Sequence, residues 1–131
     1  PFVATPLDYV AGIDALGFVL GGAMALRLGK GFIPIRKRGK LPVAVRTVEF
    51  VDYSGQTKGL EIRRSLLQSG DRVLLVDEWI ETGAQVQAAI QLIEQEGGVI
   101  AGIATMNMDD NPLPAQLRQH YTCHALWLDM H

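Results

Sequence analysis

Short apolar runs alternate along the chain with longer segments that carry one apolar face. The clearest run, residues 73–76, is followed by two acids, a Thr-Gly turn and a segment whose apolar residues recur at helical spacing: Val86, Ala89, Ile90 and Ile93. This order predicts a strand over residues 72–76, an acidic strand tip, a glycine turn and a helix over residues 83–96. Gly97 and Gly98 are expected to end that helix.

The same alternation predicts further elements on both sides of this unit. A buried helix is expected over residues 15–28, ended by Gly29, and strands are expected at 9–13, 32–35, 48–53, 99–105 and 123–128. Strands that alternate with helices predict an α/β fold with a mostly parallel sheet and helices on both faces. Ligands of such sheets bind beyond the carboxyl ends of the strands, so the strand ends at Ile13, Ile35 and Val76 are expected to surround one cleft.

The remaining segments read as connections. Pro34 indicates that its strand lies near an edge or that Pro34 is close to a strand end. The strand at 48–53 is expected at an edge of the sheet. The other expectations are an exposed, mobile basic loop at 36–46, a turn at 54–59, a strand end with one helical turn at 60–67, a loop at 109–114 and one helical turn at 115–120.

Composition narrows the class of protein. A chain of 131 residues that is 48% apolar and 20% charged indicates one ordered domain over residues 1–131. No apolar run approaches the roughly 20 residues that span a bilayer, and no secretory signal starts the chain. The net charge of −2 gives no reason to expect nucleic acid as a partner. A single cysteine, Cys123, fits a cytoplasmic protein.

The glycine turn suggests a specific chemistry. A turn between a strand and a helix directs backbone N–H groups, together with the positive end of the helix dipole, at the space beyond the strand, which suits a phosphate. Asp77 and Glu78 precede this turn and would repel the same phosphate. They suit sugar hydroxyls or a divalent cation nearby, so the stretch predicts a site for a phosphorylated ribose.

Three sequence blocks carry a resemblance to a known family. Residues 77–85 (Asp-Glu-Trp-Ile-Glu-Thr-Gly-Ala-Gln) resemble the phosphoribosyl-pyrophosphate (PRPP) signature of the type I phosphoribosyltransferases. Residues 31–42 (Gly-Phe-Ile-Pro-Ile-Arg-Lys-Arg-Gly-Lys-Leu-Pro) resemble a block of the adenine phosphoribosyltransferases, and residues 9–18 resemble their pyrophosphate-loop region. The blocks follow the family order from about residue 7 to residue 106.

The resemblance implies a fold and a reaction. The fold is the type I phosphoribosyltransferase fold, and the implied reaction transfers the 5-phosphoribosyl group of PRPP to a purine base, most simply adenine, with release of pyrophosphate. The implied cofactor is Mg²⁺, bound by Asp77 and Glu78 through PRPP or water, and the implied assembly is a homodimer. Electrostatic stabilisation and positioning would supply the catalysis.

The resemblance also assigns roles to individual residues. Asp77 and Glu78 would hold the ribose hydroxyls and count, with Asp52 as proton-transfer group, as catalytic residues. The residues expected at the ribose and its 5′-phosphate are Asp77, Glu78, Glu81, Thr82, Gly83, Ala84 and Gln85. The residues expected at the pyrophosphate are Arg36, Lys37, Lys40, Asp14 and Ala15.

Several departures from the family pattern keep alternatives open. Leu16 stands where the family has an arginine that binds pyrophosphate, and Ala84 and Gln85 replace a glycine and a threonine. The chain also begins at Pro1, so the N-terminal hood that contacts the base in the family is either missing or not included in this sequence. These features favour, as an alternative, a PRPP- or nucleotide-binding regulatory protein of the same fold. An enzyme that takes a different base is a third interpretation.

Overall fold

The computed structural model describes residues 6–14, 16–37, 45–51, 55–80, 83–108, 121 and 123–128. Two helices and seven strands lie within these ranges, and their order along the chain is as follows. They are β1 (Tyr9–Ile13), α1 (Leu16–Leu28), β2 (Gly31–Lys37), β3 (Val45–Val51), β4 (Thr57–Arg63), β5 (Arg72–Ile80), α2 (Ala84–Gln95), β6 (Val99–Met108) and β7 (Cys123–Leu128).

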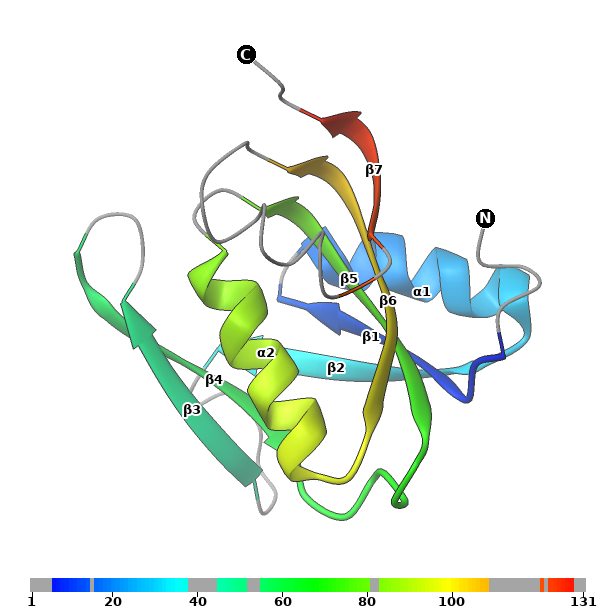
Figure 1. Cartoon of the computed structure of the whole chain (residues 1–131), viewed down its shortest axis with the longest axis horizontal. Helices are drawn as coiled ribbons and strands as arrows, with labels where there is room; N and C mark the ends of the chain where they lie inside the picture. The colour runs from blue at the N-terminus through cyan, green and yellow to red at the C-terminus, as the bar shows by residue number, and fades with distance from the viewer. Residues whose placement is uncertain are drawn as a thin grey trace.

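The strands form one sheet in the order β3-β4-β2-β1-β5-β6-β7. Strands β2, β1, β5, β6 and β7 pair in parallel, whereas β3 and β4 add an antiparallel hairpin at the β2 side. Figure 1 shows this hairpin at the left of the molecule, standing away from the parallel strands and close to α2. The prediction of a mostly parallel sheet is therefore confirmed, and β3 is the edge strand that the sequence suggested.

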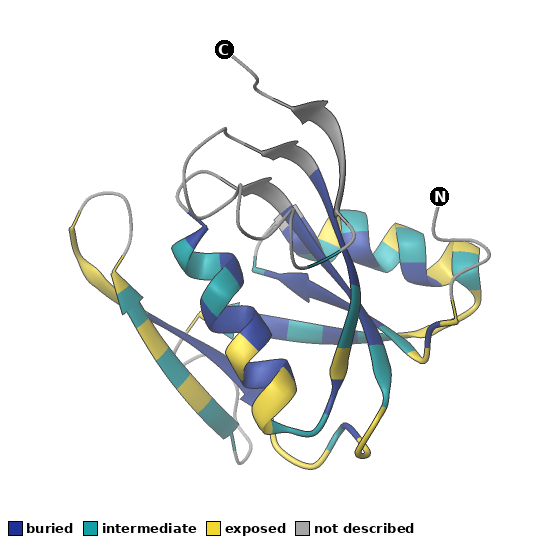
Figure 2. Ribbon diagram, viewed as in Figure 1, coloured by how far each residue is buried: buried dark blue, intermediate teal, exposed yellow. Residues whose placement is uncertain are grey.

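One helix covers each face of the sheet. The core on the α2 face contains Ile33, Ile35, Val73 and Leu75, whereas Leu74 and Val76 belong to the core on the α1 face. Successive strand residues thus alternate between two hydrophobic layers, as the pleat of a β-strand requires. Figure 2 shows both layers as dark blue ribbon at the centre of the molecule. Helices on both faces were predicted, and the structure confirms them.

Helix α1 is buried on one side only, so the prediction of a wholly buried helix was wrong. Its buried residues are Gly17, Gly21 and Ala25, spaced four apart along one stripe. Val19 and Leu26, in contrast, are 68% and 86% exposed. The outer side of α1 is apolar in sequence, and periodicity alone could not separate it from the side that packs on the sheet. Gly29, with φ of 68°, ends the helix as predicted.

Helix α2 is buried more widely than its sequence pattern indicated. The four predicted residues are buried, and Ala88 and Leu92 are buried as well. The reason is that α2 contacts β3 and β4 in addition to the parallel strands, so the hairpin covers a second side of the helix. Gly97, at φ of 92°, follows the helix where the sequence placed its end.

Predictions for two strands needed correction. Strand β5 continues through Asp77 to Ile80, because β6 pairs with it as far as Met108, so the acids lie within the strand. Strand β2 lies in the interior of the sheet, but its pairing with β4 begins only at Arg36, two residues after Pro34. The missing N–H of Pro34 is therefore not needed by β4.

The hairpin also replaces part of two predicted connections. Arg36 and Lys37 end β2 and Arg46 belongs to β3, so these ends of the predicted basic loop are strand. Strand β4 begins at Thr57, within the predicted turn, and ends at Arg63, which confirms the strand end predicted for residues 60–67. Turns at 64–65 and 69–70 and a bend at 67 follow it, and no helix is assigned there. The predictions for 38–44, 52–54 and 109–120 lie outside the described residues. No helix within the described ranges is long and apolar enough to cross a membrane.

Candidate functional site

The carboxyl end of β1 lies beside Ile35 of β2 and Val76 of β5, so the three positions predicted to surround one cleft are neighbours, although β5 itself continues to Ile80. Ile13 is in register with Ile35, and Gly12 is in register with Val76. The loop after β1 is held against β2 because the backbone N–H of Asp14 donates to the carbonyl of Ile35 over 2.9 Å. Residues from all three sequence blocks are thereby brought to one edge of the sheet.

Glycines bring the start of α1 close to this edge. A Cβ atom added to Gly17 would lie 2.9 Å from the carbonyl oxygen of Val76 and 3.7 Å from the Cα of Asp77. A Cβ atom added to Gly12 would lie 2.3 Å from the carbonyl oxygen of Gly17. Only glycine permits backbone segments to approach this closely. The segment that resembles the pyrophosphate loop thus lies directly against the strand that carries the acids.

Asp77 occupies the centre of the candidate site. It is only 6% exposed, and its Oδ2 atom accepts a hydrogen bond of 3.1 Å from the side-chain amide of Gln85, on the first turn of α2. Gly83 adopts the left-handed conformation, with φ of 86°, immediately before α2. The predicted strand, glycine turn and helix are present, but the Gln85 amide, expected at the phosphate, contacts the carboxylate in this structure.

Arg36 and Lys37 are adjacent in sequence but face opposite sides of the sheet. Arg36 lies on the α1 side, with its guanidinium carbon 5.8 Å from the centre of the Phe18 ring and its Nε atom 3.9 Å from Oδ2 of Asp14. Its Nε atom is buried and has no hydrogen-bond acceptor among the described residues. A buried donor without an acceptor is costly, so this nitrogen is well suited to an incoming anion.

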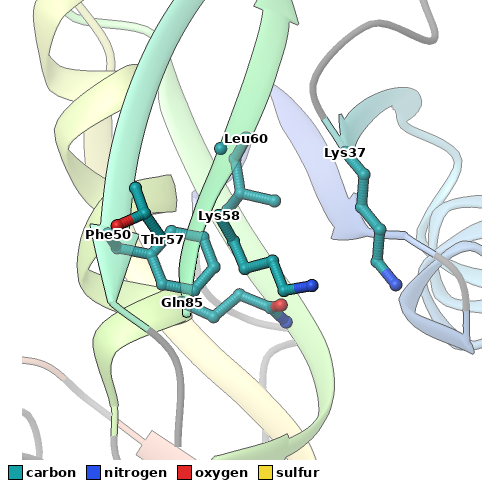
Figure 3. Close-up of a pocket in the computed structure, with 7 residues that line it drawn as sticks. Lys37, Phe50, Thr57, Lys58, Leu60 and Gln85 are labelled. Atoms are coloured by element: carbon teal, nitrogen blue, oxygen red, sulfur yellow. The ribbon is translucent and has the colours of Figure 1, made fainter. Parts of the chain in front are cut away.

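Lys37 contributes to a cavity on the other side of the sheet. The cavity has a volume of about 320 Å³ and lies between the hairpin and the start of α2 (Figure 3). It is lined by Lys37, Phe50, Thr57, Lys58, Gly59, Leu60 and Gln85. The backbone N–H of Lys37 lies 3.5 Å from Oδ2 of Asp14, so the backbone of Lys37 contacts the loop after β1 while its side chain lines the cavity. Lys58 was not singled out from the sequence, because a single lysine in a strand has no distinctive spacing.

The structure describes the other predicted site residues only in part or not at all. Glu78 lies on β5, but its side chain is outside the description. Ala84 is the first residue of α2. Ala15, Lys40, Asp52, Glu81 and Thr82 lie outside the described residues. The predicted roles of all these residues remain predictions.

A metal ion can be considered from the available donors. Within the described ranges, no three carboxylate, histidine or cysteine side chains come together to hold a metal. Mg²⁺ commonly uses one or two carboxylates together with substrate phosphates and water, without a complete protein cage. The buried carboxylate of Asp77, at the end of the sheet where Arg36 and Lys37 also end β2, fits that second arrangement.

A partly buried ion pair connects β3 of the hairpin to the end of α2. Arg46, near the start of β3, donates through Nε to Oε2 of Glu96 over 2.6 Å, and the N–H of Ser65 donates to Oε1 over 2.8 Å. Desolvation acts to raise the pKa of Glu96, but these hydrogen bonds and the charges of Arg46 and Arg64 outweigh it and leave the pKa below its ordinary value. The sequence offered no signal for this contact, because 50 residues separate its partners.

Comparisons with known proteins identify the family to which this fold and site belong. The family model of the phosphoribosyl transferase domain matches residues 6–121, and the chain belongs to this family. Two curated relatives, both named adenine phosphoribosyltransferase, are 45% identical (Cereibacter sphaeroides) and 46% identical (Chlorobium limicola) over 104 residues. Each match covers 79% of this chain and 58% of the relative, so the chain spans less than two thirds of their length.

Solved structures give the same result. The adenine phosphoribosyltransferase of Rhodothermus marinus superposes with a TM-score of 0.87 at 35% identity, covering 98% of this chain and 73% of that one. The enzyme of Giardia lamblia, solved with 9-deazaadenine, superposes with a TM-score of 0.88 at 32% identity, covering 99% and 74%. The resemblance inferred from the three sequence blocks is confirmed, as is the predicted phosphoribosyltransferase fold.

Proposed function

We propose that this protein is an adenine phosphoribosyltransferase. In the proposed reaction a ring nitrogen of the base forms a bond to C1 of PRPP, while the bond from C1 to pyrophosphate breaks and its electron pair leaves with the pyrophosphate. One proton is lost from the base. The observation that carries the proposal is the buried Asp77 of β5, hydrogen-bonded to Gln85 beyond a left-handed glycine turn.

The described residues on both faces of the sheet are proposed to bind the sugar and the charged groups of PRPP. Asp77 is suited to the ribose hydroxyls, because a carboxylate accepts hydrogen bonds from both. Gly83 and Ala84 are proposed at the 5′-phosphate, since the start of a helix favours anions. Arg36 and Lys37 are proposed to stabilise the negative charge that develops on departing pyrophosphate. Asp52 stays the predicted proton-transfer group.

Mg²⁺ is proposed as the cofactor, with Asp77 and Glu78 as its protein contacts through PRPP or water. When bound, the ion neutralises charge on the phosphates and so favours departure of pyrophosphate. The protein's own contribution is to hold the buried carboxylate of Asp77 in one orientation through the hydrogen bond from Gln85.

Removing the charge of Asp77 tests the proposed site. Asp77→Asn keeps the shape of the side chain and an oxygen that can accept from Gln85, so the fold should survive. Loss of the carboxylate should lower kcat/KM for nucleotide formation by about 100-fold or more, because transition-state charge stabilisation is typically worth that much. Product is measured by chromatography, with Glu94→Gln on the exposed side of α2 as the control. Equal activity in the two variants would show that Asp77 is not part of the active site.

An assay of the full-length protein with PRPP and a panel of bases tests the substrate. Nucleotide formation with adenine, and little with hypoxanthine or uracil, is expected. Binding of PRPP without product would favour the regulatory alternative, whereas product from another base would support the third interpretation. The relatives reported above carry the enzyme's name, which favours catalysis. A single domain, a homodimer and a cytoplasmic location stay predictions, and mass in solution tests the dimer.

A further inference from the structure

The side of the β3–β4 hairpin that faces α2 is mostly apolar and carries two basic residues, Arg46, which is paired with Glu96, and Lys58. On β3 this side carries Val48 and Phe50, which pack against the core, and on β4 it carries the buried Leu60 and Ile62. Lys58 follows the same alternation, two residues before Leu60 and directly opposite Phe50. Lys58 is exposed, so its apolar stem can lie along this face while its ammonium group stays in polar surroundings.

The surroundings that Lys58 reaches are the cavity described above. Lys37 is in register with Leu60, so it lies on the same face of the neighbouring strand β2. Both lysines line the cavity, as does Gln85 from α2. Figure 3 draws Lys58 and Gln85 close together in the view and Lys37 apart from them on β2. Two strands and one helix thus place two ammonium groups and an amide at the lining of one cavity.

The lining determines the chemistry of the ligand. It contains two lysines, a hydroxyl residue and an amide, and no acidic side chain among the described residues. Two positive charges without a carboxylate favour an anion with several oxygen atoms, of which phosphate is the most suitable. Gln85 also links the cavity to Asp77, so the cavity adjoins the proposed ribose site.

We propose that Lys58, together with Lys37, forms an anion site that holds a phosphate group of the bound phosphoribosyl substrate. This inference rests on the proposed function and adds a binding residue to it. The phosphate belongs either to the sugar's 5-position or to the pyrophosphate, and the two sources are distinguishable because ribose 5-phosphate carries only the first and inorganic pyrophosphate only the second.

Matched charge removals on one strand test the proposal. Lys58→Gln removes a charge at the cavity, and Arg63→Gln removes a charge at the far end of β4, from an exposed side chain outside the cavity lining. Dissociation constants for PRPP, pyrophosphate and ribose 5-phosphate are measured by calorimetry on the full-length protein with Mg²⁺. We expect Lys58→Gln to weaken PRPP binding about three- to tenfold, Arg63→Gln to leave it unchanged, and Lys58→Arg to retain most of the affinity.

The outcomes separate this inference from the proposed function. Weaker binding of pyrophosphate or of ribose 5-phosphate in Lys58→Gln supports the site and identifies its phosphate. Affinities equal to those of Arg63→Gln for all three ligands overturn the site and leave the proposed function intact. Lys58-dependent binding without nucleotide formation supports the site and overturns the enzyme. A wild-type protein that binds none of the three ligands overturns both.

Discussion

The pair formed by Asp77 and Gln85 illustrates how one side chain can fix the orientation of another. The sequence predicted both residues at the site, since each belongs to the block that resembles the PRPP signature. It could not predict their hydrogen bond, because the bond depends on the angle at which α2 leaves the turn at Gly83. The amide of Gln85 donates to Oδ2 of Asp77 and so holds the carboxyl group in one orientation.

Exchanging that donor for a second acid should make ligand binding depend on pH. The Gln85 amide lies 3.1 Å from Oδ2 of Asp77. In Gln85→Glu a second carboxylate would take the place of this amide beside Asp77, so the pKa of one of the two carboxyl groups should rise. At pH 8 both would be ionised and would repel PRPP, weakening its binding about tenfold; at pH 6 the shared proton should restore part of the affinity. Dissociation constants at both pH values are the measurement.

The control for this exchange is Gln85→Met, which has a similar length and no charge. It loses the amide without adding a carboxylate. If Gln85→Glu and Gln85→Met bind PRPP equally at pH 6 and pH 8, Asp77 does not interact with position 85 in solution.

Among the elements, α1 depends on the absence of side chains. Gly17 and Gly21 are buried where the helix crosses the sheet, and the approach of Gly17 to Val76 positions the whole loop after β1. Glycine is a poor helix former, so its use here indicates a packing requirement that outweighs propensity. By contrast Gly22, one residue further on, has open space around its Cα.

Two alanine substitutions on this helix should therefore have opposite effects. Gly17→Ala would place a methyl group 2.9 Å from a backbone oxygen and should lower the free energy of unfolding by about 1–3 kcal/mol. Gly22→Ala meets nothing within 4 Å and should leave stability unchanged or raise it by up to about 1 kcal/mol. Urea denaturation of both variants measures the difference. A Gly17→Ala protein as stable as Gly22→Ala would show that α1 moves away without cost.

Elements with one clear apolar period were predictable, and elements whose exposure depends on a distant neighbour were not. The buried face of α2 followed from its spacing, but Ala88 and Leu92 required knowledge that the hairpin covers the helix. Likewise Val19 is as apolar as its buried neighbours, and only the docking of α1 leaves it exposed. At the site, the residue types were predictable from the motifs, whereas the separation of Arg36 from Lys37 and the role of Lys58 depended on strand register.

At the scale of the whole molecule, the antiparallel hairpin is joined to the parallel part by its pairing with β2, by apolar packing against α2 and by a polar contact. The ion pair between Arg46 and Glu96 is this polar contact, and it connects the edge strand to the end of α2. The side chain of Glu96 is 7% exposed, so losing its partners would leave a nearly buried charge. This pair should therefore contribute to stability and make it depend on pH.

The sign of this dependence follows from the lowered pKa of Glu96. The folded pKa lies below the ordinary value of 4.5, so the stabilisation is fully present above that value and is lost as the pH falls through the folded pKa. Glu96→Gln should be less stable than wild type by about 1–3 kcal/mol at pH 7. The difference should shrink below pH 4.5, where the wild-type carboxyl also takes up a proton. Denaturant titrations at pH 7 and pH 3.5 give both values.

The neighbouring Glu94→Gln, at an exposed position of the same helix, provides the reference. A constant difference between the two variants across this pH range would mean that the charge of Glu96 does not stabilise the fold.

The alternation along β2 has a consequence for any attempt to change the length of this strand. Arg36 and Lys37 serve opposite sides of the sheet only because each stands at a fixed parity from Ile33 and Ile35. Inserting or deleting one residue upstream would send the guanidinium to the cavity and the ammonium to Phe18, whereas a change of two residues would restore their sides. Viable length variants of this strand should therefore differ by even numbers.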